Sequence, residues 1–143
     1  MSTPLAVPAT PARPRRLLRS VGAVLGALAA NAVLSLAIDQ VLHVLGVYPP
    51  WGQPMDDSRF LLATAYRLVI GVASGYLAAR LAPDRPMRHA IALGVVGVVL
   101  SLAGALATWN RPELGPKWYP LSLIVLAIPC AWLGGVIHRA RRS

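Results

Sequence analysis

The chain is short of the residues that a water-soluble domain uses to cover its surface. Of its 143 residues only 13% are charged, whereas 56% are hydrophobic. A soluble domain of this size could not bury that much apolar surface. Acidic residues are the scarcest charged type, with five against 14 lysines and arginines. The composition therefore excludes a soluble globular domain and indicates an integral membrane protein.

Cysteine and recognisable catalytic motifs are also nearly absent. Cys130 is the single cysteine, so no disulfide can form within the chain. It lies in an apolar stretch, where we expect a buried and unreactive thiol. The sequence supplies neither a nucleophile with an adjacent base nor a triad of metal ligands. We therefore expect a protein that is not an enzyme and that holds no cofactor.

Four apolar stretches take up most of the chain, at residues 21–38, 60–79, 90–109 and 119–137. Each has about the 20 residues that an α-helix needs to cross a bilayer. The sequence thus predicts an all-α transmembrane four-helix bundle with helices over about residues 20–45, 59–81, 88–109 and 119–138. Residues 1–16 would form a disordered, basic and proline-rich tail, 17–138 the single membrane domain, and 139–143 a basic tail.

The basic residues are distributed unevenly among the segments that connect these stretches. Ten lie in the amino-terminal tail, the middle connection and the carboxy terminus, and three lie in the other two connections. By the positive-inside rule, this bias predicts up-down-up-down helices with both termini in the cytoplasm. The net charge of +9 is then a topology signal. We expect membrane lipids, and not nucleic acid, as partners.

A cleaved signal peptide is an alternative interpretation of the first stretch. A basic segment precedes the apolar run, and Ala30 and Ala32 flank Asn31 as small residues flank a processing site. Cleavage after Ala32 would leave three spans in unchanged orientation. However, the apolar run continues to Ile38 without a helix breaker, which favours an uncleaved first helix.

Polar residues inside the predicted helices are the best indicators of a site. Four of them recur at every fourth position of the first helix and so share one face, namely Asn31, Ser35, Asp39 and His43. In the second helix, Arg67 lies within the apolar stretch, where a lone charge costs about 2.5–3.5 kcal/mol. Asp39 is the only acidic residue in any of the predicted helices. The sequence therefore predicts an intramembrane Asp39–Arg67 pair between the first two helices.

Two functional interpretations of these residues remain open. In the first, they form an interhelical clamp in a non-catalytic packing or accessory bundle, which assembles with itself or with a partner membrane protein. In the second, the stripe that Asn31, Ser35, Asp39 and His43 form on one helix face lines a pathway together with Arg67. The protein would then be a small oligomeric transporter or channel, with His43 at the outer mouth of the pathway. A metal site from Asp39, His43 and Asp56 or Asp57 has suitable ligand types. It lacks a second histidine or a cysteine nearby, so we expect no metal.

Small residues mark the faces on which these helices should approach one another closely. The second helix contains a GxxxG pattern at Gly71 and Gly75, and the third spaces Gly97, Ser101 and Gly104 by four and then three residues. This alternation is the 3.5-residue period of a left-handed helix pair. Together these patterns predict a tightly packed bundle.

The fourth predicted helix contains a proline and two glycines. Pro129 should bend the helix, because its ring removes one backbone hydrogen bond, and such bends more often serve packing than gating. Gly134 and Gly135 follow and would admit a neighbouring helix. His89 and His138 lie among arginines at the predicted cytoplasmic ends, where we expect both to be solvated.

Several short runs in the last two-thirds of the chain support a resemblance. They are Tyr66-Arg67, Gly75-Tyr76-Leu77, Ala79-Arg80-Leu81-Ala82-Pro83, Arg85-Pro86-Met87, His89-Ala90, Gly115-Pro116, Trp118-Tyr119-Pro120 and Trp132 with Gly134-Gly135. With these runs the chain resembles a group of uncharacterised small bacterial four-span membrane proteins. The resemblance implies a multi-pass location in a bacterial inner membrane and no particular activity. Small multidrug-resistance transporters and dual-topology fluoride channels have a similar size, but this chain differs from them in its charge bias and in lacking a membrane-embedded glutamate.

Overall fold

The computed structural model describes residues 13–143 and is built from four long α-helices and one short 3-10 turn. The helices are α1 (Arg13–Val44), α2 (Asp57–Leu81), α3 (Pro86–Thr108) and α4 (Trp118–Ala140), and the turn is η1 (Pro112–Leu114). No strand occurs between residues 13 and 143. All four helices are long and apolar enough to cross a membrane. The predicted all-α fold with four candidate membrane spans is confirmed.

The helix ends agree with the sequence-based bounds except at the start of α1. This helix begins at Arg13, so residues 13–16, which were expected in the disordered tail, are helical. Arginine is a good helix former and proline is tolerated in a first helical turn, which explains the extension through the Arg-Pro-Arg-Arg sequence. The rest of the predicted tail, residues 1–12, lies outside the described residues.

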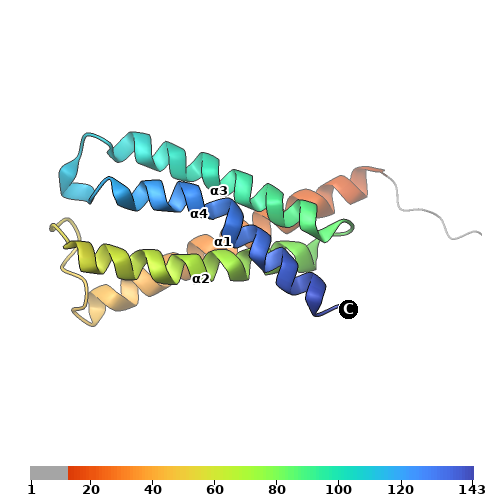
Figure 1. The fold of residues 1–143 in the computed structure, drawn as a ribbon, viewed down its shortest axis with the longest axis horizontal. Coiled ribbons are helices and arrows are strands. Elements are labelled where there is room, and N and C mark those ends of the chain that lie inside the picture. Colours follow the sequence, from red (N-terminus) through yellow and green to blue (C-terminus); the bar gives the residue numbers. More distant parts are fainter. Residues whose placement is uncertain (1–12) are drawn as a thin grey trace, which may run out of the picture.

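The helices lie side by side, with their connections at the two ends of the bundle (Figure 1). The α1–α2 and α3–α4 connections lie at one end. The start of the described part of α1, the α2–α3 connection and the carboxy terminus lie at the other end (Figure 1). The α2–α3 connection is short because Arg85 adopts a left-handed conformation, φ 41°, and Pro86 then starts α3 at a position that needs no N–H donor.

Helix α4 is the centre of the packing, since it contacts both α2 and α3 extensively, whereas α1 packs mainly against α2. The α2–α4 contact depends on glycine from both sides. A methyl group placed on Gly75 would overlap the Ala131 backbone, and one on Gly134 would overlap the backbone of Val72 and Tyr76. Backbones can approach this closely only where side chains are missing.

The other predicted packing residues differ in how closely they are approached. A Cβ on Gly71 would lie 3.3 Å from the Cβ of Cys130, and one on Gly97 would lie 3.4 Å from that of Ala127. A Cβ on Gly104, in contrast, would meet no atom within 4 Å. The close contacts of α3 are made by Gly94 instead, which lies against the backbone of Ile128.

Helix α4 changes direction about halfway along its length (Figure 1). Pro129 lies within this helix, and the missing N–H of a proline is a known cause of such bends. Beyond the bend, Gly134 faces α2, while a Cβ on Gly135 would lie 2.9 Å from the Cβ of Ala90 in α3. The bend thus lets one helix pack against two neighbours.

Large apolar side chains face outward and small ones fill the interior. Leu18, Val33 and Leu106 are 73%, 65% and 71% exposed, whereas Ala27 and Ala78 are fully buried. A soluble protein shows the opposite arrangement. Helices in lipid gain nothing from burying leucine, because lipid tails are equally apolar. The outer surface therefore suits contact with acyl chains.

Candidate functional site

The charged centre of the site is an ion pair between two helices. Asp39 lies on α1 and Arg67 on α2, and a terminal nitrogen of Arg67 donates to the Asp39 carboxylate at 2.6 Å. The two side chains are only 10% and 24% exposed, respectively. The structure thus brings together the two residues of the intramembrane pair that the sequence predicts.

Tyrosines extend this pair into a network that crosses the bundle. The hydroxyl of Tyr66 donates to the second oxygen of Asp39, and the other terminal nitrogen of Arg67 donates to the hydroxyl of Tyr119 on α4. The Tyr48 hydroxyl, in the α1–α2 connection, lies 3.4 Å from that of Tyr66 and donates to the Arg59 carbonyl at 3.3 Å. The network therefore joins α1, α2 and α4, and we call Asp39, Arg67, Tyr66 and Tyr119 the clamp.

Several contacts reduce the cost of burying charge in the clamp. The guanidinium carbon of Arg67 lies 5.5 Å from the ring centre of Tyr66 and 5.7 Å from that of Tyr119, distances at which an aromatic face attracts a cation. Asp39 accepts one hydrogen bond at each oxygen. A buried ion pair persists only when its hydrogen bonds are satisfied in this way.

Sequence reasoning missed the three tyrosines. Tyr66 is adjacent to Arg67 in the chain, and Tyr119 starts the fourth apolar stretch, but aromatic residues at such positions usually serve as interface anchors. The Tyr48 side chain is 3% exposed, and this burial raises the pKa of its phenol.

The remaining residues of the stripe find other partners. The side-chain amide of Asn31 donates to the hydroxyl of Ser74 on α2 at 3.2 Å. Nδ1 of His43 lies 2.7 Å from the backbone oxygen of Asp39, and because a carbonyl only accepts, this nitrogen carries a proton. Ser35 is buried and faces a cavity. Asn31 thus contacts α2, His43 contacts its own helix, and Ser35 faces the cavity.

Asp56, in the α1–α2 connection, bonds to its neighbours in the chain. Asp56 accepts hydrogen bonds from Ser58 at 2.7 Å and from Arg59 at 3.1 Å, and these bonds, the one from Ser58 foremost, lower the pKa of its carboxyl. Within residues 13–143, no group of three potential metal ligands lies close enough to hold an ion.

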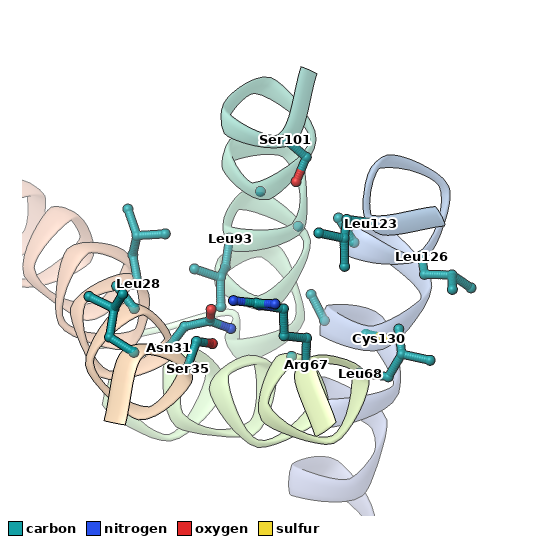
Figure 2. A pocket seen from close by; sticks show the side chains of 17 residues that line it. Leu28, Asn31, Ser35, Arg67, Leu68, Leu93, Ser101, Leu123, Leu126 and Cys130 are labelled. Atoms are coloured by element: carbon teal, nitrogen blue, oxygen red, sulfur yellow. The ribbon is translucent and has the colours of Figure 1, made fainter. Parts of the chain in front are cut away.

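Two cavities meet at Arg67, which alone among residues 13–143 lines both. The central cavity has a volume of about 420 Å³ and lies among all four helices, lined by Asn31, Ser35, Arg67, Gly71, Ser101 and Cys130 among others. In Figure 2, the side chains of Asn31 and Arg67 extend toward one another within it. The outer vestibule has a volume of about 250 Å³ and is lined by Asp39, His43, Tyr48, Trp51, Phe60 and Glu113 among others.

His138 corrects an expectation from the sequence. It is not solvated but 6% exposed, because the bent end of α4 lies on α2 and its ring packs edge-on against Tyr76, with ring centres 5.3 Å apart. Neither ring nitrogen has a hydrogen-bond partner among the described residues. His89 remains only partly covered, as expected.

No protein-family model, curated protein or solved structure matches this chain. The resemblance to small bacterial four-span proteins stays a prediction. What the site can do chemically is therefore inferred from its own geometry.

Proposed function

We propose that the chain is an up-down-up-down protein of a bacterial inner membrane with both termini in the cytoplasm. The ten-to-three distribution of basic residues supports this orientation. The arginine-rich start of α1, the α2–α3 connection and the carboxy terminus also lie together at one end of the bundle (Figure 1). A shared end lets all three segments stay on the cytoplasmic side during insertion.

Within that membrane the protein acts as a non-catalytic bundle that assembles with itself or with a partner membrane protein. One observation carries this proposal: three of the four stripe residues, and Arg67, are hydrogen-bonded inside the chain. The bonds of Asn31 and Asp39 to α2 hold helices together, and polar groups with internal partners are not free for a substrate. The clamp has a particular task, since α1 packs mainly against α2 and otherwise has few contacts.

The lining of the central cavity supports a role other than catalysis. Ser35, Ser101 and Cys130 offer hydroxyl and thiol groups, but none of the residues that line this cavity is a histidine or a carboxylate. A hydroxyl needs an adjacent base to become a nucleophile.

Thiol accessibility along the stripe tests the non-catalytic bundle in a Cys130→Ala background. Cysteines at Asn31 and Ser35 should resist small water-soluble thiol reagents, as should controls at Val33 and Leu34, which face outward and line neither cavity. Thiols react as thiolates, which a dry environment suppresses. Purification from native membranes should then yield an oligomer or a defined complex. Rapid labelling of Ser35→Cys alone would contradict this proposal.

A small transporter or channel is the second candidate, and the two cavities that meet at Arg67 favour it. In this reading the clamp separates an outer from a central compartment, and its opening would join them. Liposomes that contain the protein should then pass small solutes faster than empty liposomes. A variant with both Asp39→Leu and Arg67→Leu should change that rate, whereas equal rates in all three preparations would exclude this candidate for the solutes tested.

A further inference from the structure

The outer vestibule is a separate candidate for ligand binding. It lies where the α1–α2 connection and η1 cover the ends of the helices, outside the Asp39–Arg67 pair. Its volume of about 250 Å³ falls below the roughly 300–1,000 Å³ of pockets for drug-sized ligands. Its volume therefore suits a ligand smaller than a drug-sized molecule.

Aromatic rings make up much of the vestibule wall. His43 stacks on Trp51, with ring centres 3.9 Å apart and planes 7° from parallel. Tyr48 meets the His43 ring edge-on at 5.3 Å, and the rings of Phe60 and Tyr119 lie 5.0 Å apart. Aromatic faces carry negative potential, so several of them around one space attract a cation.

The charges of the vestibule also favour a cation. Three charged residues line it, namely Asp39, Arg67 and Glu113, and the first two neutralise each other. Among residues 13–143, Glu113 forms no ion pair. Arg59, at the start of α2, is occupied by Asp56 and by the Val47 carbonyl. With histidine counted as neutral, the residues that line the vestibule sum to one negative charge.

We propose that the outer vestibule binds a small alkylammonium ion. The Glu113 carboxylate balances its charge, while its alkyl groups lie against the rings of Trp51 and Phe60. This inference goes beyond both candidate functions, because binding requires neither a partner protein nor transport.

Three molecules of nearly equal shape test the charge preference with the full-length protein in detergent. They are choline, its neutral analogue 3,3-dimethylbutan-1-ol and the anion 3,3-dimethylbutanoate, titrated by calorimetry and tryptophan fluorescence. Choline should bind saturably and about three- to tenfold more tightly than the neutral analogue, the range for a partly exposed cation on aromatic rings. Equal binding of the two, tighter binding of the anion, or no saturable binding of choline would overturn the proposal.

Paired variants locate the site. Glu113→Gln should weaken choline binding about three- to tenfold, whereas Asp57→Asn removes the same charge from a residue that does not line the vestibule and should leave affinity unchanged. Trp51→Leu should weaken binding similarly, and Trp132→Leu, on the exposed surface of α4, should not. Thermal unfolding of each variant checks its fold, and Glu113 is exposed, so Glu113→Gln should fold even if Trp51→Leu does not. Equal effects of the Glu113 and Asp57 variants would show general charge attraction and refute the site.

Discussion

At the scale of single residues, the clamp shows how a membrane helix tolerates an arginine. Arg67 is held by Asp39, by the hydroxyl of Tyr119 and by two aromatic faces. The carboxylate and the hydroxyl would themselves be costly to bury without a partner. The two charges therefore stabilise each other, and removal of either one leaves the other charge buried without its ionic partner.

A double-mutant cycle measures this dependence. Arg67→Leu and Asp39→Leu should each lower the free energy of unfolding in detergent by about 3–5 kcal/mol, because each strands a buried charge. The double variant should lose much less than the sum, since both charges are gone. Arg59→Leu is the matched control, because its pair with Asp56 and its bond to the Val47 carbonyl are both exposed and should together be worth about 1 kcal/mol. Additive losses at Asp39 and Arg67 would show that the two are not coupled.

At the scale of elements, the fold is organised around α4. Its bend and its paired glycines let it contact α2 and α3 at backbone distance. Helix α1 joins this unit through the buried apolar cluster of Ala27, Ala78 and Leu93 and through polar contacts to α2, at Asn31 and at Asp39. Close packing thus holds all four helices together, and the clamp adds a polar link between α1 and α2.

Glycine substitutions distinguish these contacts. Gly75→Ala and Gly134→Ala should each lower the unfolding temperature in detergent, at a cost of about 1–3 kcal/mol, because the added methyl overlaps a neighbouring backbone. Gly104→Ala places the same methyl group in open space and should be neutral or stabilise by up to about 1 kcal/mol. If all three variants unfold at the same temperature, the close α2–α4 contact is wrong.

At the scale of the whole molecule, charge and apolar surface determine how the bundle sits in a bilayer. The exposed leucines and valines provide the lipid-facing surface, and arginines gather at the end that holds the carboxy terminus (Figure 1). Anionic headgroups attract each such arginine by about 1 kcal/mol. The two ends of the protein are therefore chemically different, which favours one orientation.

Cysteine labelling in intact cells tests that orientation, again in a Cys130→Ala background. Ser58→Cys, at the start of α2, should react with an impermeant thiol reagent, because the α1–α2 connection is proposed to lie outside. Asp84→Cys, in the α2–α3 connection, should react only after the cells are opened. The reverse pattern would invert the topology, and equal labelling of both would indicate dual orientation.

The sequence by itself determined the four candidate membrane spans, because a long apolar run can satisfy its backbone in lipid only as a helix. It also indicated the Asp39–Arg67 pair, since one intramembrane arginine and one intramembrane acid have few other ways to avoid burying an unpaired charge. Both inferences depend on local composition, and neither requires knowledge of how the helices are rotated.

Only the tertiary structure decided which faces meet. The rotation, tilt and bend of each helix follow from packing against its neighbours. They joined Tyr66 and Tyr119 to the clamp, buried His138 of α4 against Tyr76 of α2 and left Gly104 without a close neighbour. The two cavities arose in the same way, because they are bounded by residues from different helices and connections whose approach no sequence period encodes.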